Sequence, residues 1–224
     1  MKGKLIVVEG TDCSGKETQT NLLLEKFRNE EIKCEKFSFP NYNSPTGKIV
    51  GGPYLGKQHI SAPWFPEGAN NVDPLVASLY YAADRKYNID KILFLLENGC
   101  NVILDRYVYS NMAHQGGKES DIKKRKVIYE KLSSLEFGLL ELPEPDIKVF
   151  LHMPFIYALE LKKNREEEAD QHESNEEHLK NAEASYLEIA DLFNFDYLNC
   201  VKDNRIKTIE EINIEVMALI KNKL

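Results

Sequence analysis

The chain contains little cysteine and no long apolar segment. Its four cysteines are scattered over 224 residues without a Cys-x-x-Cys pair, which argues against a disulfide framework or a zinc site and favours reduced, intracellular thiols. No apolar run approaches the ~20 residues that a membrane-spanning helix needs. The first apolar run begins at Leu5, which leaves no room for a signal peptide. We therefore expect a cytoplasmic protein without a membrane partner.

An excess of positive charge is also absent. The chain has 29 Lys and Arg against 36 Asp and Glu, a formal net charge of −7, so a general nucleic-acid-binding surface is not expected. No linker, repeat or low-complexity segment divides the sequence. Its length suits one α/β domain, which we predict to span residues 1–224.

A phosphate-binding loop is the most informative feature that is present. A short apolar run, Leu5–Val8, predicts a buried strand, and Gly10, Gly15 and Lys16 follow with G-x-x-x-x-G-K spacing. Glycines let the backbone turn its N–H groups toward an anion, and the next helix presents its N-terminal N–H groups to the same anion. Glu17 stands where this motif usually has a Mg²⁺-binding hydroxyl. The alternative, a Gly-Ser turn before a surface lysine, does not explain the strand and amphipathic helix on either side.

Strand and helix patterns alternate along the chain. This order predicts an α/β fold with a parallel, about five-stranded sheet, helices on both faces and ligands at the carboxyl ends of the strands. The expected strands are 5–8, 36–39, 102–104, 147–151 and 195–198. The expected helices include 73–98, two within 155–193 around a charged stretch, and 208–224. Residues 51–71 are expected to form an ordered surface loop.

Polar residues follow the predicted third strand. Asp105 at the tip of this strand lies where a metal-binding or water-orienting carboxylate is needed. The neighbouring Arg106 offers a bidentate fork for a phosphate. The alternative is a surface ion pair, which contributes little to stability. The position beside a phosphate-binding loop favours the functional interpretation.

An aromatic residue and an arginine share one face of the long predicted helix. Tyr81 and Arg85 are four residues apart, so they are able to flank one flat object such as a nucleobase. A core tyrosine on an amphipathic helix explains Tyr81 equally well. Residues 39–42 (Phe-Pro-Asn-Tyr) end the second strand at the same sheet edge, where their side chains are able to face a ligand.

Taken together, these segments resemble the thymidylate kinase family, whose members transfer a phosphoryl group from Mg·ATP to dTMP. The matching segments occur in family order at 8–19, 39–42, 82–85, 105–111, 142–147 and 170–173. The resemblance implies a P-loop nucleoside monophosphate kinase, a three-layer fold with a helical lid near 160–177, and a homodimer.

The resemblance also implies roles for individual residues. Lys16, Asp12, Arg106 and a lid arginine would take part in catalysis. Asp12 would accept from the 3′-hydroxyl of the deoxyribose or help to hold Mg²⁺, and Asp105 is the other candidate metal-binding carboxylate. Residues expected to contact ATP are Gly10, Asp12, Cys13, Ser14, Gly15, Lys16, Glu17 and Thr18. Residues expected to contact dTMP are Phe39, Tyr42, Tyr81, Arg85, Arg106, Ser110, Asn111, His114, Asp170 and Glu173.

Three departures from the family pattern, at Glu17, Asn41 and His114, carry expectations of their own, and so does the composition of the phosphate loop. Asn41 stands where some members have an arginine, so one phosphate contact is expected to be missing. Glu17 is expected to face away from the polyphosphate, because a carboxylate beside it would be repelled. His114 stands where many members have a tyrosine. It is expected either to lie near the 2′ side of the sugar or to be a core histidine whose hydrogen bonds are satisfied within the protein. The phosphate loop has no arginine, so the lid must supply the catalytic cation. Among Lys162, Lys163 and Arg165, we choose Arg165, which alone is able to fork two oxygens; a surface pair with a lid glutamate is the alternative.

Three functions are compatible with the sequence. The first is a dTMP kinase that uses ATP and Mg²⁺. The second is a P-loop kinase for another (deoxy)nucleoside monophosphate or a nucleoside, and Arg106 favours an acceptor that carries a phosphate. The third is an ATP-binding switch with little turnover, which has no need for a base-reading helix such as that around Tyr81 and Arg85.

Overall fold

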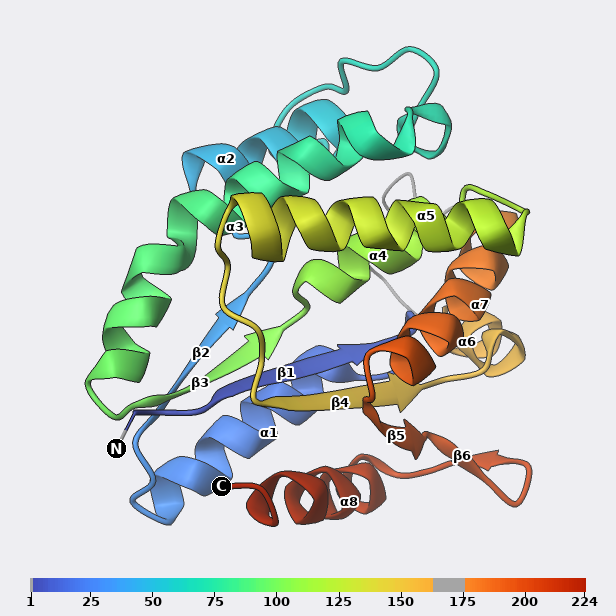
Figure 1. Ribbon diagram of the computed structural model, residues 1–224. Coiled ribbons are helices and arrows are strands. Elements are labelled where there is room, and N and C mark those ends of the chain that lie inside the picture. The colour runs from blue at the N-terminus through green and yellow to red at the C-terminus, as the bar shows by residue number, and fades with distance from the viewer. Residues whose placement is uncertain (1, 163–175) are drawn as a thin grey trace.

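The computed structural model describes residues 2–162 and 176–224 and has a parallel sheet at its centre (Figure 1). The strand order is β2-β3-β1-β4-β5. The sheet strands are β1 (Leu5–Gly10), β2 (Cys34–Ser38), β3 (Asn101–Asp105), β4 (Ile147–His152) and β5 (Asp196–Asn199). The helices are α1 (Lys16–Asn29), α2 (Pro45–Ile49), α3 (Pro74–Glu97), α4 (Val108–Gly116), α5 (Ile122–Ser133), α6 (Phe155–Lys162), α7 (Glu176–Leu192) and α8 (Ile209–Lys221). The predicted α/β fold with a five-stranded parallel sheet is confirmed.

Alternating residues of β1 build the two halves of the core. Leu5 and Val7 point to the face covered by α3, α4, α5 and α7, whereas Ile6 and Val8 point to the face covered by α1 and α8. Figure 1 shows the same two layers of helices above and below the sheet. Because both faces are buried, β1 is apolar at every position from Leu5 to Val8, as a central parallel strand must be.

The ends of the strands differ from the prediction by one or two residues. β2 ends at Ser38, not at Phe39, because the chain turns at Pro40. The N–H of Phe39 still donates to the carbonyl of Asp105 at 3.1 Å. Val8 of β1 is in register with Asp105 of β3. The carboxyl ends of β1, β2 and β3 therefore meet at one edge, where the predicted site residues lie.

Side-chain caps fix the ends of the long helices. The carboxylate of Asp73 accepts from the N–H groups of Leu75 and Val76 at the start of α3, so Asp73 is the N-cap of this helix. α8 begins at Ile209 with a capping box between Thr208 and Glu211. The two helices predicted within 155–193 are α6 and α7. Among the described helices, none has both the length and the apolar character to cross a membrane.

The segment 51–71 is ordered, but the prediction of a surface loop is wrong for its first part. Residues Val50–Tyr54 form a π-helix, η1, that is completely buried, and a short 3-10 helix, η2, spans Ala69–Asn71. The ammonium group of Lys118 donates to the carbonyls of Ala69 and Val72, both at 2.8 Å. This segment and the start of α3 share a small separate core.

Two parts of the fold have no counterpart in the prediction. Strands β6 (Val201–Lys202) and β7 (Arg205–Ile206) form a two-stranded antiparallel hairpin after β5. A π-helix, η3 (Ser134–Leu139), directly follows α5. Glu136 within η3 is completely buried, which brings a carboxylate into the site described next.

Candidate active site

The phosphate-binding loop has the backbone geometry that its glycines predict. A Cβ atom at Gly10 would lie 2.5 Å from the carbonyl oxygen of Leu151, so only glycine fits between β1 and β4. Gly15 has a φ of 77°, in the left-handed region, directly before α1. Cys13 has a φ of 58°, a strained conformation for a residue with a side chain. The loop is therefore a fixed turn that aims the N-terminus of α1 at a ligand.

Lys16 is folded against this loop. Its ammonium group donates to the carbonyls of Gly10 and Thr11, both at 2.8 Å, and the residue is only 6% exposed. Burial and the nearby Arg106 lower the pKa of Lys16 to about 8. The buried hydroxyl of Ser14 has no hydrogen-bond partner among the described residues. A charged donor held against such a loop is what an anionic ligand would engage.

Arg106 extends from the end of β3 toward the loop. Its backbone has a φ of 66°, which turns the side chain away from the sheet. One guanidinium nitrogen, Nη2, donates to Asp12 Oδ1 at 3.1 Å, and Nη1 donates to the hydroxyl of Tyr186 at 3.2 Å. Burial opposes its charge, but Tyr186 and Asp12 hold the pKa of Arg106 well above its ordinary value. Arg106 is thus a permanent cation beside the phosphate loop.

A buried carboxylate that the sequence analysis missed supports this arrangement. Glu9 accepts from the backbone N–H groups of Tyr107 at 2.7 Å and Ser110 at 3.0 Å, and from the Ser110 hydroxyl at 2.6 Å. Burial raises the pKa of Glu9, against the hydrogen bond from Ser110 and the charge of Arg106. Glu9 therefore satisfies N–H groups at the start of α4 and holds the chain directly after Arg106.

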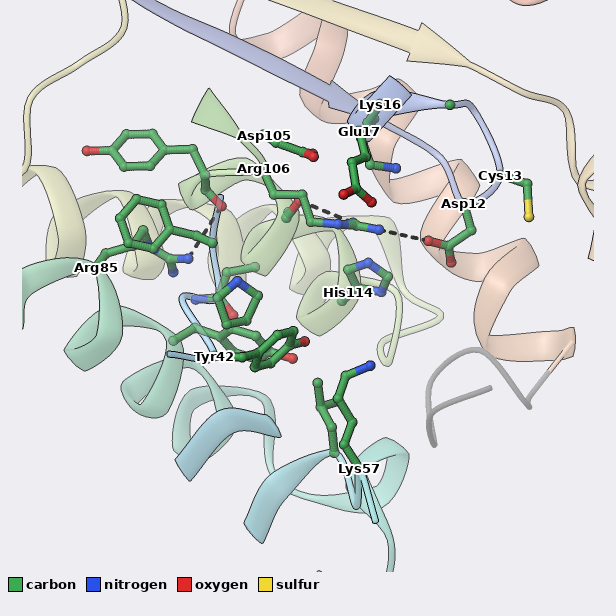
Figure 2. Close-up of a pocket in the computed structure, with 18 of the residues that line it drawn as sticks. Asp12, Cys13, Lys16, Glu17, Tyr42, Lys57, Arg85, Asp105, Arg106 and His114 are labelled. Carbon is green, nitrogen blue, oxygen red and sulfur yellow. Dashed lines mark hydrogen bonds and ion pairs between the residues drawn. The ribbon is translucent and has the colours of Figure 1, made fainter. Parts of the chain in front are cut away.

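A single cavity of about 350 Å³ brings most of the predicted site residues together (Figure 2). The predicted residues that line it are Asp12, Cys13, Gly15, Lys16, Glu17, Thr18, Phe39, Tyr42, Tyr81, Arg85, Asp105, Arg106, Ser110, Asn111 and His114. Gly10 and Ser14 are buried behind this lining. Arg165, Asp170 and Glu173 lie outside the described residues, as does Lys163, and the structure places none of them.

Glu17 faces this cavity, so the expectation that it points away is wrong. It belongs to the cavity lining and is solvent-exposed. Figure 2 shows Glu17 beside Lys16 and Asp105, across the cavity from Tyr42 and Lys57. As the second residue of α1, Glu17 lies in the positive field of the helix N-terminus, which stabilises a carboxylate there.

Lys57 is a cavity residue that the sequence pattern did not indicate. Its ammonium group lies 5.3 Å from the ring centroid of Tyr42, a cation–π distance. The segment after η1 carries it to the cavity, on the side away from the phosphate loop (Figure 2). Because that segment was expected to be a surface loop, no local signal pointed to Lys57.

His114 lines the cavity and contacts a second histidine, while a position near the sugar stays a prediction. It lines the cavity, and its Nδ1 lies 3.2 Å from Nε2 of His178 in α7, with the two rings stacked. Burial lowers the pKa of His114 to about 3. Its imidazole is therefore neutral near pH 7 and adds no charge to the cavity.

Arg85 and Asn111 form the deepest side of the cavity and share one buried partner. The carboxylate of Glu136 accepts from Nε and Nη2 of Arg85, the second at 2.6 Å, and from Nδ2 of Asn111 at 3.0 Å. Burial opposes the charge of Arg85, but Glu136 raises its pKa above the ordinary value. Tyr81 reaches the same cavity from one turn earlier on α3. An aromatic ring, a cation and an amide thus converge there.

The strand order, the phosphate loop and a second cation at the end of β3 define a P-loop phosphotransferase with one cavity for a polyphosphate and an anionic acceptor.

A profile of the thymidylate kinase family matches residues 8–212. Thymidylate kinase of Prochlorococcus marinus (strain NATL2A) is 32% identical over the whole of both chains. The Schizosaccharomyces pombe enzyme is 29% identical, over 99% of this chain and 93% of that protein. The chain belongs to the thymidylate kinase family.

A solved structure supports the fold. The thymidylate kinase of Candida albicans superimposes with a TM-score of 0.73, over 99% of this chain and 92% of the other, at 24% sequence identity. At this identity the comparison concerns the fold alone.

Proposed function

We propose that this chain is a thymidylate kinase that transfers the γ-phosphoryl group of ATP to dTMP and releases dTDP and ADP. The observation that carries the proposal is that one cavity is lined by the phosphate loop, by Arg106 and by the group of Tyr81, Arg85 and Asn111. Family membership over the length of the chain supports the same reaction.

On the donor side, Lys16 and the loop N–H groups bind the ATP phosphates. When ATP enters, the Lys16 ammonium leaves the two loop carbonyls for phosphate oxygens, which bind a cation more strongly than neutral acceptors do. Phosphoryl transfer is catalysed mainly by positioning and charge neutralisation. Lys16 therefore neutralises negative charge that spreads over the migrating group.

On the acceptor side, Arg106 binds the 5′-phosphate of dTMP. Its contacts with Asp12 and Tyr186 already fix the guanidinium. Binding of the phosphate therefore costs little further side-chain entropy of Arg106. Tyr81 stacks on thymine, and Arg85 and Asn111 bind the carbonyl and N3 edge of the base. The remaining acceptor contacts that we propose are Phe39, Tyr42, Ser110 and His114, which line the same cavity.

The carboxylates near the phosphate loop fit a Mg²⁺ ion that arrives with ATP. Among the described residues, no three acidic, histidine or cysteine side chains gather into a ready-made metal site. Mg²⁺ is usually held by one or two carboxylates together with substrate phosphates, and Asp12, Asp105 and Glu17 line the cavity. Bound there, the ion would neutralise phosphate charge. One or two of these carboxylates would hold it, together with phosphate oxygens.

The titration of Lys16 makes ATP binding depend on pH. Because burial lowers the pKa of Lys16 to about 8, the free protein loses this positive charge above pH 8, while the phosphates are already fully ionised. We expect the Kd for ATP to rise by up to about tenfold per pH unit above pH 8, since binding then requires proton uptake. Calorimetry from pH 7 to 9.5 measures this, with Lys16→Met as the control whose Kd stays flat. A wild-type Kd equal at both ends of the range would contradict the assignment.

Arg165 is our choice for the lid cation. Arg165→Ala is expected to lower kcat by about 10³-fold with little change in the KM for ATP, because an arginine that stabilises the transferring phosphoryl group acts in the transition state. Lys163→Ala is the matched control from the same segment. A loss below about tenfold for Arg165→Ala would assign this arginine to a surface ion pair.

We propose that the protein is a homodimer that pairs through α3. Several large apolar side chains on this helix are solvent-exposed, namely Leu75, Val76, Leu79, Tyr87 and Phe94. Leu79, Tyr87 and Phe94 are spaced eight and seven residues apart, so they share one face. Contiguous exposed apolar side chains mark interaction surfaces. The molar mass in solution, from light scattering, tests this: one chain mass would exclude the dimer.

Release of ADP by the purified full chain tests the reaction. ATP and Mg²⁺ are supplied with each of dTMP, dUMP, dCMP, dGMP, UMP and thymidine. We expect dTMP to give the largest kcat/KM. A different best acceptor would select the broader kinase hypothesis, and ATP binding without acceptor-dependent ADP release would select the switch.

A further inference from the structure

Glu136 lies beneath the base end of the cavity and contacts no solvent. Its side chain is fully buried, and it belongs to η3, which packs beside α5. It faces three N–H groups: Nε and Nη2 of Arg85 and Nδ2 of Asn111. A carboxylate paired with a buried arginine is ionised, so it accepts hydrogen bonds and donates none.

This restriction fixes the orientation of the Asn111 amide. Since Glu136 accepts only, Asn111 must turn its NH₂ group toward Glu136, and its carbonyl oxygen, Oδ1, must point the other way. Oδ1 is buried and has no hydrogen-bond partner among the described residues, and Asn111 lines the cavity. A buried carbonyl oxygen without a partner is costly unless a ligand donates to it.

The same carboxylate also orients Arg85. Nε and one N–H of Nη2 donate to Glu136. Nη1 donates to the carbonyl of Tyr107 at 3.4 Å. The other guanidinium N–H groups are left for a ligand. Arg85 is a donor only. The floor of the cavity therefore offers one fixed acceptor, Asn111 Oδ1, next to one fixed donor, Arg85.

We propose that Glu136 is the positioning residue that sets base selectivity at this site. An acceptor beside a donor is complementary to an N–H beside a carbonyl, the edge that the keto pyrimidines thymine and uracil present. Cytosine presents the reverse, an acceptor ring nitrogen beside an amino donor. It would place an acceptor against Asn111 Oδ1 and a donor against Arg85. The inference deepens the proposed function, and it rests on dTMP as the acceptor nucleotide.

Replacement of the carboxylate by an amide tests the proposal. Glu136→Gln keeps the shape of the side chain but places an NH₂ group among three donors. The conflict with Asn111 is relieved when the Asn111 amide rotates by 180°, which presents its NH₂ group to the cavity in place of Oδ1. We expect the ratio of Kd for dCMP to Kd for dTMP to fall by about 10–100-fold, the factor associated with one buried unpaired group. Glu136→Asp, which keeps an acceptor-only group, is expected to restore most of the ratio.

Arg125 and Glu188 provide a matched control. They form a second bidentate ion pair, in which Arg125 donates from Nε to Oε2 of Glu188 at 2.9 Å and from Nη2 to Oε1 at 2.6 Å. Neither residue lines the cavity. Glu188→Gln should change the melting temperature but leave the Kd ratio within about twofold. If Glu136→Gln does not fold, Asn111→Leu takes its place, since it removes Oδ1 and leaves the Arg85–Glu136 pair intact; it too must lower the ratio.

Direct binding measurements separate this proposal from the proposed reaction. Calorimetry with dTMP and dCMP reports selectivity even if no ADP is released, so a protein without turnover would refute the kinase function alone. A folded Glu136→Gln or Asn111→Leu variant that keeps the wild-type ratio would overturn the role of Glu136. A wild-type protein that binds dCMP as tightly as dTMP would overturn it as well.

Discussion

Lys16→Met is expected to lower kcat/KM for dTMP phosphorylation by about 10³-fold or more, the range found when one preorganised charge at a transferring group is removed. The side chain is only 6% exposed and its ammonium is held within 2.8 Å of two loop carbonyls, so it is already aimed where the phosphates bind. Methionine keeps most of the apolar stem and removes the charge. Initial rates of ADP release measure the loss.

Lys26→Met on the same helix is the matched control. Lys26 lies about three turns further along α1. It is half-exposed and pairs with Glu210 at 3.7 Å, so its loss should leave kcat/KM within about twofold. The melting temperature of Lys16→Met should not fall, because removal of a buried charge whose pKa is lowered relieves a cost. Turnover within tenfold of wild type would remove Lys16 from catalysis.

Local sequence patterns were enough to predict most of the residues that line the cavity. The phosphate loop is a contiguous segment whose geometry follows from its glycines, and Asp105 and Arg106 end a strand next to it in the sheet. Tyr81 and Arg85 share a helix face by spacing alone. In each case, the residues that act together are close in sequence or are set by strand order.

The residues that support the site were not predictable in the same way. Glu9 reaches Tyr107 across 98 positions of sequence, and Glu136 reaches Arg85 across 51. An isolated glutamate carries no signal of its burial or of its partners, and burial is what gives these two carboxylates their effect. Lys57 was missed for a related reason, since the irregular stretch around it gave no periodicity from which to predict the buried π-helix before it.

The strain at Arg106 argues for its role. A φ of 66° in a residue with a long side chain is costly unless the surroundings enforce it, and here Glu9 fixes the next residue through the N–H of Tyr107 at 2.7 Å. The conformation directs the guanidinium to Asp12 and away from the core. This arrangement places a permanent charge beside the phosphate loop in the cavity lining.

Arg106→Lys is therefore expected to lower kcat/KM for dTMP by about 10²–10³-fold while the Kd for ATP changes less than threefold. Lysine keeps one positive charge and the same backbone preference, but it has no planar fork, so it cannot hold Asp12, Tyr186 and two phosphate oxygens together. The loss should appear in both kcat and KM, because the phosphate is held less well in the ground state and misplaced for in-line transfer. Arg28→Lys, an exposed pair with Glu35 at 3.7 Å, is the matched control and should behave as wild type. If Arg106→Lys instead weakens ATP and dTMP equally, Arg106 belongs to the donor phosphates rather than to the acceptor.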